Sequence, residues 1–262
     1  MSEPLITYEL DGNIALIGLN RPDKRNAIND PLIDELRAAV LRAHEEADVA
    51  VLFGHGSNFC AGLDLAEALA RATGQIKAPR KRKRHNWHEV FDLIARGPIP
   101  FVAALHGAVV GGGLELAMAA HVRVADETVV CGLPEGQRGI FVGGGGSVRI
   151  PRLIGAARMT DMMMTGRVYN AVDGERVGFA QYLVPTGTAF DKAFELAQRI
   201  AQNAPLTNYA LMHALPRIAE QPSDQGLMTE AMMAAIAQSA PEAKARVRAF
   251  LDGKAAKVKK QD

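Results

Sequence analysis

The sequence predicts an α/β fold, and two patterns carry this prediction. Short apolar runs typical of buried strands alternate with helical patterns through the first two thirds of the chain, an order that favours parallel βαβ units. The last third contains helical patterns only. We therefore expect a core over residues 1–200 and a C-terminal helical region over residues 201–262, which packs on the core or on a neighbouring subunit.

The chain begins with a predicted β-hairpin. Two apolar runs, residues 5–10 and 14–19, flank Asp11-Gly12-Asn13, and Asp-Gly between apolar runs is a strong hairpin signal. Pro31 then opens a helical pattern that Asn29 or Asp30 can cap.

The remaining elements follow from the spacing of apolar residues and from glycine and proline. Strands are predicted at residues 49–53, 101–105, 122–125, 128–131 and 181–184. Helices are predicted at residues 63–72 and 114–120, from residue 147 onward with Gly155, Gly166 and Gly178 as punctuation, and at 189–203, 205–220, 225–239 and 241–251.

Composition and charge narrow the functional classes. Hydrophobic residues make up 48% of the 262 residues and charged residues 23%, which excludes a disordered chain because a packed core can form. The formal net charge of +1 gives no overall attraction to nucleic acid or to an anionic membrane. Aromatic residues reach only 5%, which argues against a surface that stacks on bases.

Three features concern the compartment. Cys60 and Cys131 are too few for a disulfide framework and are typical of a reducing compartment. No uncharged apolar stretch approaches the roughly 18 residues that a membrane helix needs, and residues 1–13 lack the apolar run of a signal peptide. We therefore expect a soluble, cytoplasmic protein.

Two glycine clusters, Gly107-Ala-Val-Val-Gly-Gly-Gly113 and residues 143–146, indicate close approach of the backbone to a ligand or to another chain. The alternative is that they only let a helix pack tightly on the sheet. Neither cluster fits the dinucleotide fingerprint, and no phosphate-binding loop with Gly-Lys-Ser/Thr is present.

Two glutamates stand next to these clusters in apolar surroundings. Glu115 lies in the first turn of a predicted helix between Leu114 and Leu116, and Glu135 follows a predicted strand. A carboxylate in such a place is costly unless it is paired, hydrogen-bonded or functional. The alternative to a catalytic role is that each satisfies a local backbone donor or an arginine such as Arg138.

Several segments, taken in order, resemble the crotonase, or enoyl-CoA hydratase/isomerase, superfamily over nearly the whole chain. They are residues 20–27 (NRPDKRNA), 59–65 (FCAGLDL), 106–117 (HGAVVGGGLELA), 133–135 (LPE) with Gly139, the glycines of 143–146 with Arg149, 153–155 (LIG) and 163–166 (MMTG). The resemblance implies a crotonase-like spiral of ββα units, a C-terminal helical trimerisation region, and a homotrimer or a hexamer of two trimers.

The resemblance also implies a reaction and the residues that perform it. The substrate is an acyl-CoA thioester, whose carbonyl oxygen meets the backbone N–H groups of Leu63 and Gly112. Glu115 and Glu135 match the two glutamates that add water across the 2,3 double bond, and Gly143 matches the N–H that helps hold the water. No metal and no cofactor is implied, because CoA is part of the substrate.

Contacts to CoA are implied around two segments. These residues are Lys24, Arg25, Ala27, Ala61, Asp64 and Leu65. Lys24 and Arg25 suit charge-assisted bonds to phosphate, although they can equally be solvated loop charges. A basic run from Lys77 to Arg84 falls where the family has a variable loop beside the acyl pocket, and Trp87 and Phe91 after it either line that pocket or belong to the core.

The chain also departs from the family pattern, and other readings stay open. Val142 stands where hydratases usually have proline, and Arg138 can pair with Glu135 and lower its pKa. The alternatives are another CoA-enolate reaction (isomerase, hydratase-lyase or acyl-CoA hydrolase), RNA binding by the basic run, and a Cys60 nucleophile with His55 or His106 as its base.

Overall fold

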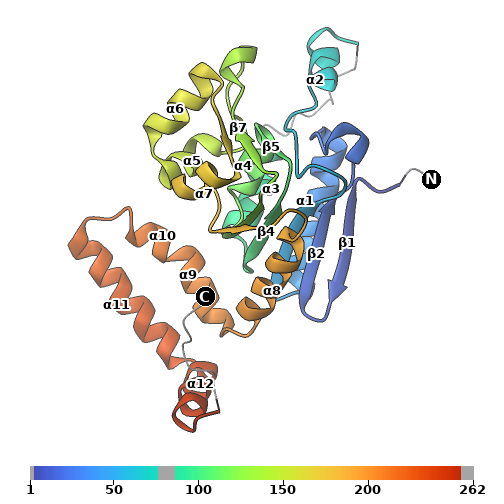
Figure 1. Cartoon of the computed structure of the whole chain (residues 1–262). Coiled ribbons are helices and arrows are strands. Elements are labelled where there is room, and N and C mark those ends of the chain that lie inside the picture. Colours follow the sequence, from blue (N-terminus) through green and yellow to red (C-terminus); the bar gives the residue numbers. More distant parts are fainter. Residues whose placement is uncertain (1–2, 76–85, 255–262) are drawn as a thin grey trace. The chain divides into compact units, whose positions relative to one another are not determined.

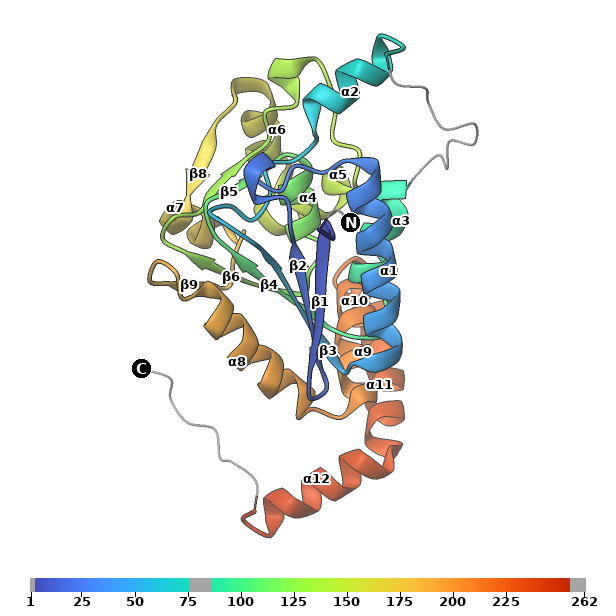
Figure 2. The ribbon, with the colours of Figure 1, turned by 90° about the vertical axis from the view of Figure 1, so that its right-hand side faces the viewer.

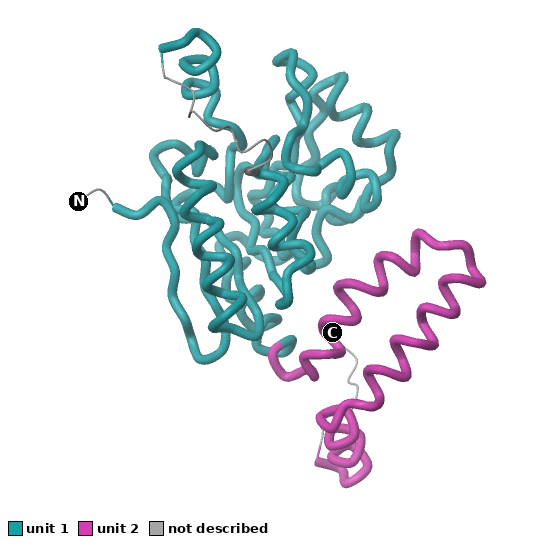
Figure 3. Tube along the Cα trace, turned by 180° about the vertical axis from the view of Figure 1, so that it is seen from behind, with its two compact units in different colours: residues 1–200 teal, residues 201–262 magenta. Residues whose placement is uncertain are grey.

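A computed structural model describes residues 3–75 and 86–254. The chain divides into two compact units, Met1–Ile200 and Ala201–Asp262, which Figure 3 distinguishes by colour. The basic run from Lys77 to Arg84 lies outside the described residues. In the part of the chain that is described, no helix is long and apolar enough to cross a membrane.

The first unit is built on a main sheet with the strand order β1-β2-β3-β4-β6-β9 (Figure 1). β1 (Ile6–Asp11) and β2 (Ile14–Leu19) form the predicted antiparallel hairpin, with Gly12 at a φ of 61° in the turn. The strands that follow β2 in the sheet are parallel to their neighbours: β3 (Val49–Gly54), β4 (Phe101–Leu105), β6 (Val122–Asp126) and β9 (Tyr182–Val184).

Helices cover both faces of this sheet, as Figure 2 shows for α1 (Asp30–Glu46) and α8 (Ala189–Ala201). α1 begins at Asp30, one residue before Pro31, and of the two predicted caps it is Asn29 whose side chain accepts a hydrogen bond from the N–H of Leu32. On the opposite face, Phe190 of α8 packs edge-on against Phe53 of β3, with ring centroids 4.9 Å apart.

A second, smaller sheet has the order β5-β7-β8 and was not fully predicted. β5 (Ala108–Val110) is parallel to β7 (Val130–Gly132), which is antiparallel to β8 (Val168–Asn170). Each of these strands has 3 residues, too few for the alternation of side chains to stand out in the sequence. An isolated bridge between Cys60 and Val109 joins the loop after β3 to this sheet.

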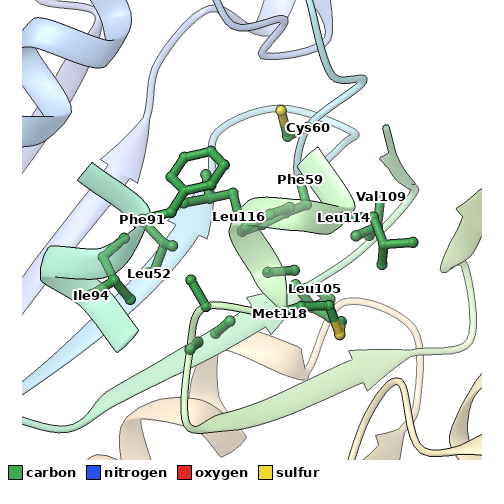
Figure 4. Packing of buried hydrophobic residues seen from close by; sticks show 14 of the residues in the cluster. Leu52, Phe59, Cys60, Phe91, Ile94, Leu105, Val109, Leu114, Leu116 and Met118 are labelled. Carbon is green, nitrogen blue, oxygen red and sulfur yellow. The ribbon is translucent and has the colours of Figure 1, made fainter. Parts of the chain in front are cut away.

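The short helix α4 (Gly112–Ala117) is buried over its whole length. Figure 4 shows Leu114 and Leu116 packed among Phe91, Leu105 and Val109. The helix begins two residues before the predicted start, at Gly112. A Cβ atom on Gly113 would lie 2.3 Å from the carbonyl oxygen of Cys60, so only glycine fits there.

The first unit contains further short helices in its described part. They are η1 (Pro22–Lys24), α2 (Leu65–Ala72), α3 (Asn86–Arg96), η2 (Gly136–Arg138), α5 (Gly146–Ile154), α6 (Ala156–Thr165) and α7 (Ala171–Val177). α2 starts two residues later than predicted because the Asp64 side chain caps it by accepting from the N–H of Glu67. The predicted glycines end α5, α6 and α7.

The second unit is helical throughout its described part. Its helices are α9 (Pro205–His213), α10 (Leu215–Ile218), α11 (Ser223–Ser239) and α12 (Pro241–Leu251). One helix was expected over residues 205–220, but the chain forms α9 and α10 with Pro216 in the first turn of α10, since proline has no N–H to continue a helix. Exposed apolar side chains gather on the last two helices: Leu227, Met228, Met232, Ile236, Val247, Phe250 and Leu251.

A buried asparagine holds together two loops of the first unit. Asn26 is fully buried at a φ of 54°, and its Oδ1 accepts from the N–H of Arg21 at 2.8 Å. Its Nδ2 donates to the carbonyls of His55 and Asn58 at 2.9 and 2.7 Å. The side chain therefore joins the loop after β2 to the loop after β3.

We expect Asn26→Ala to lower the free energy of unfolding by about 2–4 kcal/mol, because buried polar groups lose their partners and alanine is strained at a positive φ. Urea denaturation measures this loss. The matched control is Asn13→Ala, which removes an exposed bond to Asp48 and should cost less than about 0.5 kcal/mol. Equal losses in the two variants would contradict the anchoring role of Asn26.

Candidate active site

Glu115 and Glu135, the predicted catalytic pair, are both buried, and their carboxyl groups come from different elements. Glu115 lies in the first turn of α4 and is 2% exposed. Glu135, 6% exposed, follows β7 and immediately precedes η2. A Cβ atom on Gly111, the residue before α4, would lie 2.8 Å from Oε1 of Glu135, so that carboxyl group rests against the helix start. The fold thus brings together two carboxyl groups 20 positions apart in the sequence.

The carboxylate of Glu115 is held by backbone N–H groups of the glycine cluster. Gly144 and Gly146 each donate to Oε1 at 2.7 Å, and Gly143 donates to Oε2 at 3.3 Å. These donors stand at the start of α5, where the helix dipole favours a negative charge. A Cβ atom on Gly146 would lie 2.7 Å from Cγ of Glu115, so glycine is required for this close approach.

Glu135 has a different environment. Within the described part of the chain, its Oε2 atom has no hydrogen-bond partner. Burial raises the pKa of Glu135, and the nearby charge of Glu115 raises it further, while a hydrogen bond from its own backbone N–H and the charge of Arg138 act in the opposite direction. The charge of Arg138 lowers the pKa of Glu135 as predicted, but desolvation outweighs it and the net shift is upward.

The segments that carry Leu63 and Gly112 run side by side. The N–H of Cys60 donates to Ala108 and the N–H of Val110 donates to Cys60, at 2.9 and 3.0 Å. A Cβ atom on Gly62 would lie 3.2 Å from the amide nitrogen of Gly112. Neither the N–H of Leu63 nor that of Gly112 donates to another described residue, so both are free to bind a ligand atom.

The predicted CoA-binding residues lie on two segments that are also bonded to each other. Ala61 donates to the carbonyl of Arg25 at 2.9 Å. Further along, Ile28 donates to Gly62 at 2.7 Å, and Asp64 donates to Ile28 at 2.9 Å. These bonds bring together the six predicted positions: Lys24, Arg25, Ala27, Ala61, Asp64 and Leu65.

The side chains among these positions differ in availability. Lys24 and Arg25 are exposed, which leaves their charges free for a phosphate. The carboxylate of Asp64 is already engaged, because it caps α2 and accepts from Arg21 at 3.2 Å. This pairing lowers the pKa of Asp64 although burial opposes the shift.

Two aromatic residues of α3 border the glycine segments. A Cβ atom on Gly112 would lie 2.3 Å from Cζ3 of Trp87, and one on Gly144 would lie 2.5 Å from the ring of Phe91. Phe91 is fully buried and belongs to the core, whereas Trp87 is partly exposed beside the start of α4. The sequence allowed Phe91 either to line the acyl pocket or to belong to the core, and the structure places it in the core.

Cys60 does not have the environment of a nucleophile. Its thiol is fully buried and donates to the carbonyl of Asn26 at 3.1 Å. Burial raises the pKa of this thiol to about 12, so the reactive thiolate is disfavoured. The two histidines considered as bases bond elsewhere: His55 to Thr7 at 2.8 Å and His106 to Gly56 at 3.0 Å.

Asp92, a residue of α3 that lies in no recognisable motif, forms an ion pair with Arg149 of α5. Arg149 also donates to the carbonyl of Gly144 at 2.9 Å. Asp92 and Arg149 are 57 positions apart, and no spacing pattern in the sequence indicates that they form an ion pair. The pair adjoins the loop that holds Glu115.

Comparisons with known proteins identify the family. The model of the enoyl-CoA hydratase/isomerase family matches residues 9–261. An enoyl-CoA isomerase/hydratase of Mycosarcoma maydis is 35% identical over 239 residues, which cover 87% of this chain and 85% of the relative. The human enoyl-CoA hydratase domain-containing protein 2, mitochondrial, is 33% identical over 229 residues, with coverages of 85% and 77%.

Comparison with solved structures leads to the same family. The protein in a crystal structure from Rhodopseudomonas palustris has 51% sequence identity to this chain. Its structure superposes with a TM-score of 0.87, and the match covers 97% of each chain. The chain belongs to the enoyl-CoA hydratase/isomerase family and has the crotonase fold, which confirms the resemblance predicted from its motifs. This family acts on acyl-CoA thioesters.

The raised pKa of Glu135 has a consequence for stability. Because folding raises this pKa, the group stabilises the folded state fully below its unfolded pKa, and this contribution is lost as the pH rises through the folded pKa. Glu135→Gln removes the ionisation. The unsubstituted chain therefore loses stability relative to Glu135→Gln as the pH rises. We expect the unfolding free energy of the variant minus that of the unsubstituted chain to increase from pH 4 to pH 8. Urea titrations at both pH values measure it, and a constant or falling difference would contradict the assigned environment.

Proposed function

We propose that this chain is an enoyl-CoA hydratase, which adds water across the 2,3 double bond of an enoyl-CoA thioester. The observation that carries the proposal is the meeting, at the start of α4, of two buried carboxyl groups and two backbone N–H groups that donate to no described residue. Carboxyl groups move protons and N–H groups stabilise an oxyanion, and hydration of a conjugated thioester needs both.

The N–H groups of Leu63 and Gly112 bind the thioester oxygen in this proposal. When water attacks C3, negative charge moves through the conjugated system to that oxygen, and the donors stabilise the enolate that forms. Their position supports this assignment, since neither N–H group donates to a described residue and Gly112 is the first residue of α4, where a helix has unpaired N–H groups. Removal of one such donor in other enzymes costs about 10²–10³ in rate.

Glu115 and Glu135 divide the proton transfers. Glu115 takes a proton from the water whose oxygen bonds to C3, and Glu135 gives a proton to C2 of the enolate. The raised pKa of Glu135 supports its role as the proton donor, because only a protonated carboxyl group can give a proton to C2. The proton taken by one carboxyl group replaces the one given by the other, so the number of protons on the pair is the same before and after the reaction.

Gly143 is the donor that we assign to the water oxygen. Its bond to Glu115, at 3.3 Å, is longer than the 2.7 Å bonds from Gly144 and Gly146, which supports a shared role. Lys24 and Arg25 are assigned to the CoA phosphates, and the backbone near Ala61 and Leu65 to the rest of the nucleotide. The reaction proposed requires no metal or added cofactor. The cytoplasmic location stays a prediction, since the human relative is named as mitochondrial.

Double-bond isomerisation is the second candidate. The Mycosarcoma maydis relative is named as an isomerase/hydratase, which supports it. An isomerase moves one proton between carbons and needs a single acid–base group, whereas hydration uses both. Two buried carboxyl groups at one place therefore favour hydration. Product analysis distinguishes the two, because hydration gives a 3-hydroxyacyl-CoA and isomerisation a shifted double bond.

We expect Glu115→Gln and Glu135→Gln each to lower kcat for hydration by about 10²–10⁴, the usual range for a positioned acid or base. Glutamine keeps the size of the side chain, so CoA binding should survive. The double variant should lose far less than the product of the single losses, because both groups act on one water. Steady-state kinetics on short, long and aromatic enoyl-CoAs, with product identification, measures these effects.

Two results would contradict this mechanism. If Glu115→Gln hydrates at the rate of the unsubstituted chain, a mechanism that uses both carboxyl groups is excluded. Loss of activity in Glu135→Gln alone, together with a double-bond isomer as the product, would make isomerisation the better assignment. Glu127→Gln, at a glutamate whose side chain accepts from Thr186 near the surface, is the control for the substitution itself and should leave kcat unchanged.

We also propose that the second unit forms a trimer-based oligomer. The exposed apolar side chains of α11 and α12, among them Ile236, Phe250 and Leu251, are a surface that association can bury. Sedimentation velocity at micromolar concentration should give a trimer or a hexamer. A stable monomer at that concentration would contradict the proposal.

A further inference from the structure

The loop that holds Glu115 needs support from outside itself. Residues 143–146 are four consecutive glycines, the residue type with the largest loss of backbone entropy on folding. Yet the N–H groups of Gly144 and Gly146 converge on one oxygen of Glu115 at 2.7 Å each. A sequence so free to move does not hold this geometry by its own preferences.

Arg149 supplies a contact on the other side of the loop. Its Nη1 donates to the carbonyl oxygen of Gly144 at 2.9 Å, so Gly144 is bonded through its N–H to Glu115 and through its carbonyl to Arg149. A Cβ atom on Gly145 would lie 2.4 Å from the same Nη1, which shows how closely the guanidinium group fits against the loop. The side chain of Arg149 is 15% exposed.

Asp92 fixes the guanidinium group in turn. Its Oδ1 accepts from Nη2 of Arg149, so the two ends of the planar group are bonded to different elements. Asp92 belongs to α3, which also places Phe91 against Gly144. The loop is therefore held between a core helix and the carboxylate that it cradles.

Charge supports the same arrangement. Burial lowers the pKa of Arg149, while the charges of Asp92 and Glu115 favour its charged form and that of Arg96 opposes it. Among the described residues, Glu115 thus joins Asp92 in stabilising the cation. The guanidinium group is coupled to Glu115 electrostatically as well as through Gly144.

We propose that Arg149, oriented by Asp92, is a positioning residue that holds the glycine loop and through it the carboxylate of Glu115. This inference rests on the proposed function, in which Glu115 handles the attacking water. Arg149 acts through Gly144 and touches no reacting atom. Its loss should therefore impair the water step more than the steps that Glu135 and the backbone N–H groups perform.

The test compares two reactions in the same variants. Hydration of but-2-enoyl-CoA uses Glu115, whereas exchange of the C2 protons of butanoyl-CoA with D₂O uses Glu135 and the oxyanion donors without adding water. Arg149→Ala should lower kcat for hydration by about 10- to 100-fold with little change in KM, since a small misplacement costs this much. Proton exchange, followed by NMR, should fall much less, as in Glu115→Gln.

Further variants keep the test independent of folding. Asp92→Asn, at a half-exposed partner, should shift the ratio of the two rates in the same direction by a smaller factor. Millimolar guanidinium should partly restore hydration in Arg149→Ala and not in Glu115→Gln. The matched control is Arg152→Ala, on the same helix, where the exposed arginine bonds the carbonyl of Val148, and its rates should not change.

The outcomes separate the two proposals. If Glu115→Gln is slow while Arg149→Ala and Asp92→Asn hydrate at the unsubstituted rate, the positioning role is wrong and the proposed function stands. Equal losses in hydration and exchange in Arg149→Ala, without restoration by guanidinium, also overturn it, because they indicate general damage. If Glu115→Gln itself hydrates normally, the proposed function fails first.

Discussion

The burial of the Glu115 carboxylate is the constraint on which the rest of the site depends. A carboxylate that is 2% exposed is costly unless hydrogen bonds replace its water. Here the replacement comes from N–H groups of the glycine cluster at the start of α5. The backbone must come close to the carboxylate, which explains why glycines occupy these positions. Because glycines have no side chains, Arg149 and Phe91 can pack directly against the loop.

The small second sheet performs the complementary task. Its strand β5 leads directly into α4, and the bridge from Cys60 to Val109 brings the segment of Leu63 alongside. Two loops from different parts of the chain thus present N–H groups at one place. Glu135 enters from the end of β7, the neighbour of β5 in this sheet. The strands are short, yet they determine which groups face the substrate in the proposed reaction.

Much of this arrangement could be predicted from the sequence, because it is encoded locally. The hairpin follows from Asp11-Gly12, the start of α1 from Asn29, and the ends of α5, α6 and α7 from single glycines. The family motifs identified Glu115 and Glu135, and the fold brings these two carboxyl groups to the start of α4. Each of these features depends on a few neighbouring residues or on a motif with a fixed order.

What could not be predicted depends on distant contacts and on competing energies. The three-residue strands β5 and β8 are too short for their sequences alone to indicate strands, and their formation depends on pairing with β7. The pKa of Glu135 rises because desolvation outweighs Arg138, a balance that no spacing pattern contains. The pair of Asp92 and Arg149 joins two helices that are far apart in the sequence.

A crystal structure with a bound saturated acyl-CoA, which cannot be hydrated, would show directly whether the two N–H groups and the two carboxyl groups face one substrate. We expect the thioester oxygen to lie about 3 Å from the amide nitrogens of both Leu63 and Gly112, with C2 and C3 facing Glu135 and Glu115. A thioester oxygen bonded elsewhere, or an acyl chain directed away from the two carboxyl groups, would contradict this expectation.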